Sequence, residues 1–211
     1  SGISAIAYDR LLEHLRFHDR RVWVYDVVQQ VAQPSQEVLD YFRIDVVDVG
    51  RTFDTRDTDW SPCTLANGNP AYQPAWFRPE AQSDGSFIVV QDGEAIARMP
   101  TGATFYDQAV FPFQDGYPER LEGELERAMR KVHWSALAHS PWDHAQEADF
   151  WQQLRANALQ LHATTDRAII VVAGCNLFEW GTFLRRLDNF LMDLVLNPGS
   201  VERLLDALLE R

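Results

Sequence analysis

Five polar residues stand where a parallel β/α fold gathers its chemistry. Asp26 and Asp48 each end a short apolar run, Arg51 follows the second run, and Cys175 and Asn176 end a third. Because reactive groups in parallel barrels collect beyond the carboxyl ends of the strands, we predict that these residues line a pocket. Asp26 and Asp48 are suited to act as a general acid and base pair, or to hold a cationic or hydroxyl-rich ligand. Each aspartate is equally suited to be an ordinary cap or salt-bridge partner.

The histidines raise the question of a metal. His139, Asp143 and His144 lie in one loop, and this set can bind zinc or shuttle protons only if the loop folds back on itself. We predict His144 as a weaker substrate contact. His14 and His18 are spaced for one helical face but have charged neighbours and no third ligand, which indicates a solvated surface. Without a phosphate loop, nucleophile elbow or paired-cysteine site, we predict no metal site and no resident cofactor in this chain.

The elements that must position these residues alternate between strands and helices. Apolar runs at 22–25, 46–49 and 168–172 are typical of parallel strands buried on both faces. Helical spacing of apolar residues occurs at 4–15, 35–41, 121–132, 147–162, 180–194 and 198–209. This alternation predicts the α/β class and a partial (β/α)8 TIM barrel, its first half only, since a closed barrel usually takes ~250 residues.

Residues 51–118 interrupt this alternation. Asn67-Gly68, Asp84-Gly85 and Asp92-Gly93 are hairpin signals, and they separate short runs that predict a small antiparallel β subdomain. We therefore divide the chain into first β/α units at 1–50, an inserted meander at 51–118 and continuing β/α units at 119–211. The insertion is suited to be a lid over the substrate mouth, and equally to be a decorative subdomain or dimer contact.

Composition narrows the classes of function. Nineteen Lys and Arg against 31 Asp and Glu give a formal charge of −12, which would repel nucleic acids and anionic membranes, so we predict neither as a partner. No apolar run has the length of a membrane helix, and the N-terminus lacks the blocks of a secretory signal. Cys63 and Cys175 stand far apart, as expected for two free thiols. The predicted location is the cytoplasm.

The segment 168–209 resembles the uroporphyrinogen decarboxylase superfamily of TIM barrels. The resemblance is carried by the strand and turn at 169–175 and by 177–181, 189–194, Asn197-Pro198 and 201–209, and more weakly by 22–25, 36–41 and 45–51. It implies a fold shared by decarboxylases of porphyrin metabolism and by zinc-dependent methyltransferases that act on corrinoid, coenzyme M or methylated substrates. It also implies that the chain ends in mid-helix at Arg211, after the first half of the barrel.

Two departures from the decarboxylases favour a methyltransferase. Asp26 stands where decarboxylases carry an arginine-bearing motif for the acidic side chains of a porphyrinogen, and Cys175-Asn176 replaces their alanine-proline turn. In the methyltransferases, zinc is bound by a late His and Cys set, which would lie beyond Arg211. The resemblance therefore implies zinc and a corrinoid in the full-length protein, a small-molecule substrate, and a corrinoid protein as partner, with this fragment inactive alone. The alternatives are a uroporphyrinogen decarboxylase, or a non-catalytic half-barrel module that binds a partner or a second copy as a homodimer.

Overall fold

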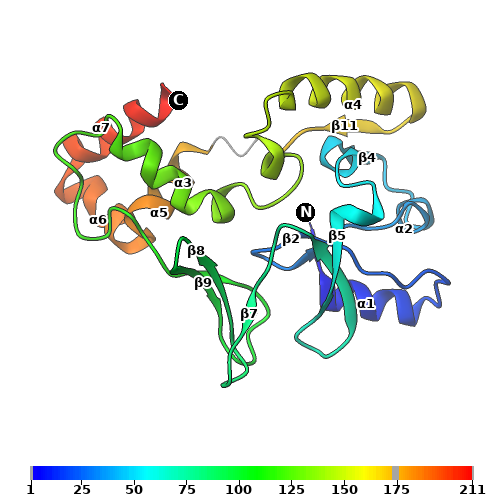
Figure 1. The fold of residues 1–211 in the computed structure, drawn as a ribbon. Helices are drawn as coiled ribbons and strands as arrows, with labels where there is room; N and C mark the ends of the chain where they lie inside the picture. Colours follow the sequence, from blue (N-terminus) through cyan, green and yellow to red (C-terminus); the bar gives the residue numbers. More distant parts are fainter. Residues whose placement is uncertain (1, 173–175, 211) are drawn as a thin grey trace.

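A computed structural model describes residues 2–172 and 176–210 (Figure 1). The protein is mixed α/β, and its strands form several small sheets. The strands are β1 (Ile3–Ser4), β2 (Val24–Asp26), β3 (Val31–Ala32), β4 (Val46–Asp48), β5 (Trp60–Thr64), β6 (Pro70–Pro74), β7 (Glu80–Ala81), β8 (Phe87–Gln91), β9 (Glu94–Met99), β10 (Asp107–Gln108) and β11 (Ala168–Ile170). The α-helices are α1 (Ala5–His14), α2 (Gln36–Tyr41), α3 (Glu124–Ala136), α4 (Phe150–Thr164), α5 (Leu177–Arg185), α6 (Leu187–Leu196) and α7 (Pro198–Leu209), and the 3-10 helices are η1 (Val49–Thr52), η2 (Asp57–Asp59) and η3 (Trp142–His144).

Strands β4 and β11 form a parallel pair. Val46 stands opposite Ala168 and Asp48 opposite Ile170, while α4, which precedes β11, contacts both β11 and η1. Parallel neighbours need a crossover connection, and α4 lies on the long connection between these two strands. Among the described residues no sheet closes into a barrel.

The first predicted strand does not join that pair. The runs that end at Asp26 and Asp48 were both predicted as parallel strands, but β2 pairs in antiparallel fashion with β3 instead of with β4. The reason is local, because the carboxylate of Asp26 accepts hydrogen bonds from the N–H groups of Val28 and Gln29 and stabilises a turn directly after β2. That turn reverses the chain, so β3 pairs with β2 before a crossover can form.

The burial predicted for the third strand is also wrong. Ile169 packs against a cluster that contains Val49 and Phe150, but Ile170 and Val172 are 44% and 52% exposed. The parallel pair is therefore covered on the side of α4 and open to solvent on the other. A continuous apolar run predicts burial on both faces only when a second layer is present.

Local signals at the N-terminus and in the meander are confirmed. Helix α1 begins after Ser4, whose hydroxyl accepts the N–H of Ala7 at 3.3 Å, and Tyr8 is fully buried. Asn67-Gly68 joins β5 to β6, and the two Asp-Gly signals join β7 to β8 and β8 to β9. The glycines adopt positive φ angles, which favour glycine at these turns. The resulting sheet has the order β10-β9-β8-β7.

Helices α3, α5, α6 and α7 pack together at one end of the molecule, away from α4 and the parallel pair (Figure 1). The single helix expected over 180–194 is two helices, because Arg186 has a φ of 70° and breaks it. The break lets the ring of Phe190 fold back over Gly181, where any side chain would collide with it. An ion pair of 2.7 Å between Arg185 and Asp193 spans the same break.

Helix α7 begins at Pro198 as predicted, although the side chain of Asn197 makes no capping hydrogen bond. No helix in residues 2–172 and 176–210 is long and apolar enough to cross a membrane.

Candidate functional site

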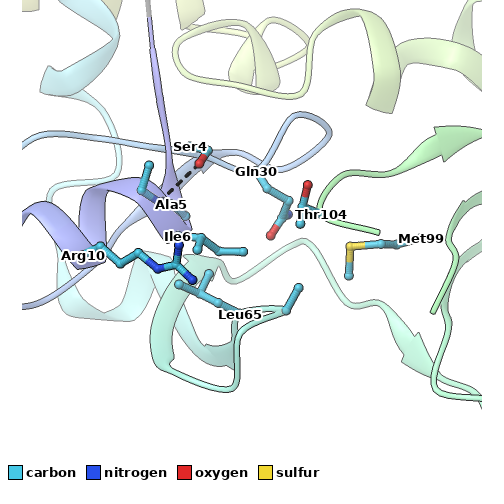
Figure 2. A pocket seen from close by; sticks show the side chains of 10 residues that line it. Ser4, Ala5, Ile6, Arg10, Gln30, Leu65, Met99 and Thr104 are labelled. Carbon is cyan, nitrogen blue, oxygen red and sulfur yellow. Dashed lines mark hydrogen bonds between the residues drawn. The ribbon is translucent and has the colours of Figure 1, made fainter. Parts of the chain in front are cut away.

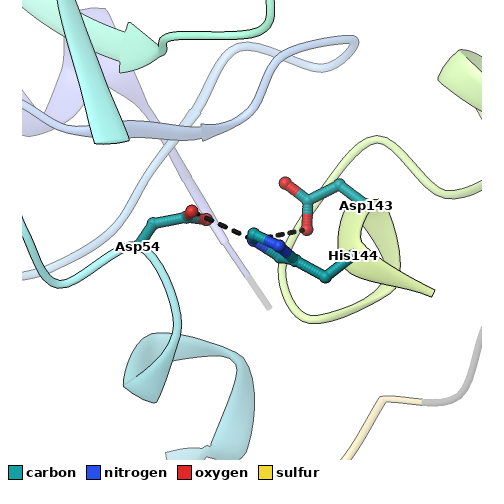
Figure 3. Close-up of side chains that lie close together, drawn as sticks. All are labelled: Asp54, Asp143 and His144. Carbon is teal, nitrogen blue, oxygen red and sulfur yellow. Dashed lines mark hydrogen bonds and ion pairs between the residues drawn. The ribbon is translucent and has the colours of Figure 1, made fainter. Parts of the chain in front are cut away.

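Three titratable side chains from two distant segments converge on one point (Figure 3). His144 Nε2 lies 3.0 Å from Asp54 Oδ1 and 3.7 Å from Asp143 Oδ1. The side chains of Asp54 and Asp143 are only 7% and 4% exposed, and that of His144 is 22% exposed. The two carboxylates are thus buried, and the imidazole connects them to solvent. We call these three residues the Asp-Asp-His cluster.

The segment after β4 carries Asp54 to the cluster. Asp48 Oδ1 accepts the N–H of Gly50 at 2.5 Å, which starts η1 directly at the end of the strand. Asp54 follows η1 with a φ of 47°, a left-handed conformation that aspartate tolerates better than most residues. Asp54 therefore lies beyond the carboxyl end of a parallel strand, where β/α folds gather their reactive groups.

The loop after α3 carries Asp143 and His144. Its 3-10 helix η3 is anchored by Trp142, whose ring packs on Phe150 at 5.6 Å and whose indole N–H donates to the carbonyl of Val172. Gly50 lies so close to the carbonyl of Ser140 that a Cβ at position 50 would lie inside van der Waals contact. The two segments are therefore held together by close backbone packing as well as by the cluster itself.

Further groups hold the cluster in place. The hydroxyl of Ser140 donates to Asp54 Oδ2, and the indole N–H of Trp76 donates to Asp143 Oδ2 at 3.1 Å. Glu147 Oε1 lies 2.8 Å from His144 Nδ1, so that both ring nitrogens face a carboxylate. The ring of Phe53 lies 5.4 Å from the imidazole.

The charges of the cluster depend on one another. Hydrogen bonding to Asp54, assisted by Glu147 and by the charge of Asp143, raises the pKa of His144 to about 9. With this pKa, the imidazole ring of His144 is protonated and positively charged at neutral pH. Burial, and then the negative charge of Asp54, raise the pKa of Asp143. Asp143 Oδ1 has no hydrogen-bond partner among the described residues.

Only one residue predicted as a site residue joins the cluster, and that is His144. Asp26 and Asp48 cap the turns that follow their strands, and Asn176 caps α5 by accepting from the N–H groups of Phe178 and Glu179. Arg51 donates to the carbonyl of Pro34 at 3.2 Å, and Cys175 lies outside the described residues. The predicted pair of Asp26 and Asp48 is thus held in two separate turns.

The predicted loop set is split by the structure. Asp143 and His144 contribute to the cluster, whereas the ring of His139 packs against Tyr25 with centroids 6.1 Å apart. Sequence reasoning missed Asp54, Ser140 and Glu147. The position of Asp54 a few residues after a predicted strand is a weak indication of a site residue. Its partner His144 lies 90 residues further along the chain, so the sequence does not connect the two.

The chain also has a hollow of about 380 Å³ elsewhere (Figure 2). It lies beside the start of α1 and is lined by side chains that include Ile6, Leu65 and Met99, with Arg10 as its titratable group. None of the residues predicted to carry chemistry lines it, so the candidate site remains the cluster.

The zinc site implied by the resemblance contains cysteine thiolates, and the described residues hold no such site. In residues 2–172 and 176–210, the Asp-Asp-His cluster is the one group of three possible metal ligands that lie within reach of one another, and it contains no cysteine. Cys63 lies in β5, where burial raises the pKa of its thiol to about 11. Searches of protein-family models, curated proteins and solved structures gave no match to this chain.

Proposed function

We propose that this chain belongs to an enzyme on a β/α framework that binds a polar small molecule where β4 and β11 end. Support comes from the convergence of Asp54, Asp143 and His144 from two segments beyond the carboxyl end of a parallel strand. Burial disfavours the charged form of the Asp143 carboxyl group, and titratable groups perturbed in this way gather at functional sites. The partial TIM barrel expected from the sequence is part of this proposal.

Within that framework we favour a methyltransferase of the uroporphyrinogen-decarboxylase type over a decarboxylase. The observation that carries this preference is the excess of acid at the site, since the carboxylates of Asp54, Asp143 and Glu147 all lie near His144. A porphyrinogen with several carboxylates would meet like charges there. A neutral or cationic methylated substrate would not. The zinc, the corrinoid and a corrinoid protein partner remain proposals for the complete protein.

The test is an assay of two reactions side by side. Protein produced from the complete coding sequence is incubated with a methylated corrinoid and a thiol, and separately with a porphyrinogen under reducing conditions. We expect transfer of the methyl group to the thiol and no release of CO₂ from the porphyrinogen. Release of CO₂ without methyl transfer would favour the decarboxylase over the methyltransferase. If neither reaction is observed, both of these functions are excluded.

A second candidate is a non-catalytic binding module. It is favoured by apolar residues on the surface of α6, where Val195 and Leu196 are 79% and 78% exposed, and by the open face of β11. This candidate predicts a stable dimer or complex without turnover. Sedimentation velocity at rising concentration tests it, because a monomer throughout, together with methyl transfer, would exclude the module.

A further inference from the structure

We propose that Asp54, Asp143 and His144 bind one divalent transition-metal ion such as Zn²⁺ or Mn²⁺. The inference goes beyond the proposed methyl transfer, because the zinc expected from the resemblance would use thiolates in another part of the barrel. The site proposed here uses two carboxylates and one imidazole of this chain. Its evidence comes from three features of the cluster (Figure 3).

The first feature is the spacing of the ligand atoms. In a tetrahedral zinc site with bonds of about 2.0–2.2 Å, neighbouring ligand atoms are roughly 3.3–3.6 Å apart. His144 Nε2 lies 3.0 Å from Asp54 Oδ1 and 3.7 Å from Asp143 Oδ1, and the three ligand atoms all lie within 4.8 Å of one another. Small rotations of the side chains would bring all three within bonding distance of one ion.

The second feature is an oxygen of Asp143 that accepts no hydrogen bond, although His144 Nε2 lies 3.7 Å from it. The side chain of Asp143 is only 4% exposed, yet Oδ1 has no hydrogen-bond partner among the described residues. Buried carboxylate oxygens are normally paired, and an unpaired one needs an explanation. Because Trp76 holds Oδ2, the free Oδ1 is directed at His144 and Asp54. A cation between the two carboxylates would supply the missing partner and relieve their repulsion.

The third feature is the support behind each ligand. Ser140 holds the second oxygen of Asp54, Trp76 holds that of Asp143, and Glu147 lies 2.8 Å from Nδ1 of His144. When Nδ1 donates to a carboxylate, Nε2 is left as the coordinating atom, and this arrangement is the usual outer shell of a metal-bound histidine. Glu147 is therefore a positioning residue for the ligand His144.

The donor set selects the class of ion. One imidazole with two carboxylates suits Zn²⁺, Mn²⁺ or Fe²⁺, whereas Mg²⁺ prefers oxygen ligands alone and Cu⁺ prefers thiolates. Three protein ligands leave at least one position for water or substrate, as in catalytic metal sites. The exposed part of His144 places that open position towards solvent.

Calorimetric titration of the metal-free protein with ZnCl₂, MnCl₂ and MgCl₂ tests the proposal. We expect one Zn²⁺ per chain, similar or weaker binding of Mn²⁺, and much weaker binding of Mg²⁺. His144→Gln and Asp143→Asn should each weaken Zn²⁺ binding by at least about 10-fold, and Glu147→Gln by roughly 10-fold through the lost orientation. Visible absorption of Co²⁺ in the wild-type protein, altered by His144→Gln, reports coordination directly.

Matched controls separate coordination from general damage. Asp9→Asn changes another buried aspartate, which is 7% exposed on α1, and His162→Gln changes an exposed histidine of α4. Both should bind Zn²⁺ as the wild type does. Zn²⁺ should also raise the melting temperature of the wild type and of both controls, but not that of His144→Gln. Equal affinity in wild type and Asp143→Asn, equal losses in the controls, or no stoichiometric binding by the folded protein would each overturn the site.

Discussion

Asp26 and Asp143 are both buried aspartates, but they are held in opposite ways. Asp26 is 8% exposed, and one of its oxygens accepts two backbone N–H groups from the next three residues, at 3.1 and 2.9 Å. Asp143 is held by Trp76, 67 residues away, while its other oxygen lies 3.7 Å from His144 Nε2 and has no hydrogen-bond partner among the described residues. Burial raises the pKa of both carboxyl groups, and the charge of Asp54 raises that of Asp143 further.

The difference separates a structural carboxylate from one that is available for binding. The partners of Asp26 come from its own turn, so the carboxylate and the turn form together. The indole of Trp76 and the carboxylate of Asp54 reach Asp143 from remote segments, which the fold must bring together against a desolvation cost. A group kept at such a cost with a free oxygen is the stronger candidate for function.

The largest effect should come from separating the two segments of the cluster. Gly50→Ala places a methyl group inside van der Waals contact of the Ser140 carbonyl. Because backbone must move to admit it, we expect a loss of about 3 kcal/mol in the free energy of unfolding. Urea denaturation followed by circular dichroism measures this loss.

Gly199→Ala is the control for that substitution. Gly199 lies in α7, and a Cβ there would meet no atom within 4 Å. Alanine has the higher helix propensity, so we expect stability unchanged or increased by up to about 1 kcal/mol. Equal stabilities of the two variants would show that the segments are not packed as described.

The second effect concerns the charge on His144 and its dependence on pH. The pKa of this histidine is about 9 in the folded protein, against ~6.5 for an unperturbed imidazole. The ion pairs of His144 therefore stabilise the folded protein fully below pH ~6.5, and this stabilisation is lost as the pH rises through about 9. With chelator present, His144→Gln should cost about 2 kcal/mol at pH 6, a value reduced for partial exposure. The cost should shrink towards pH 9.5.

Urea denaturation of both proteins at pH 6, 7.5 and 9.5 gives this dependence. Asp54, Asp143 and Glu147 all face the ring, so the variant removes the one positive charge among three carboxylates. A cost that is constant across this range would mean that His144 is neutral at pH 6. Replacement of the exposed His162 is the control for the loss of a histidine as such.

What the sequence predicts well in this molecule is local. The start of a helix near residue 4, the Asn-Gly and Asp-Gly turns and the start of a helix at 198 all depend on a few neighbouring residues, and the structure confirms them. The pairing of β2 with β3 and the break at Arg186 were missed. Both depend on contacts that compete with the periodicity, namely an early turn and the close approach of Phe190 to Gly181.

The candidate site was predicted only in part for the same reason. His144 and Asp143 share a loop, and their types and spacing mark them as possible ligands. Nothing in the sequence connects that loop to Asp54, which lies in an acidic stretch with Asp57 and Asp59. The connection depends on the glycine at position 50 and on its contact with Ser140, which only the fold reveals.

The third effect tests the structural role of Asp26. Asp26→Ala leaves the N–H groups of Val28 and Gln29 without their acceptor, and we expect a loss of about 1 kcal/mol, since removal of the buried charge offsets part of the cost. Asp26→Asn keeps an acceptor oxygen and should remain near wild-type stability. Thermal denaturation compares them. If the asparagine variant were the less stable one, the charge of Asp26 and not its hydrogen bonds would be what the turn requires.

The smallest effect on stability, and the most informative sign, is expected for Asp143→Asn. A raised pKa means that the folded protein disfavours the charged carboxyl group, so this charge lowers stability above pH ~4 and not below it. Attraction to His144 is already part of this balance and keeps the effect small, so in chelator we expect the variant to be equal to wild type or more stable by up to about 0.5 kcal/mol. Excess Zn²⁺ should reverse the order, because only the wild type gains full binding free energy. Thermal denaturation with chelator and with Zn²⁺ measures the stability difference between the variant and the wild type under both conditions. A variant that is less stable in chelator and equally stabilised by Zn²⁺ would make Asp143 a structural residue like Asp26.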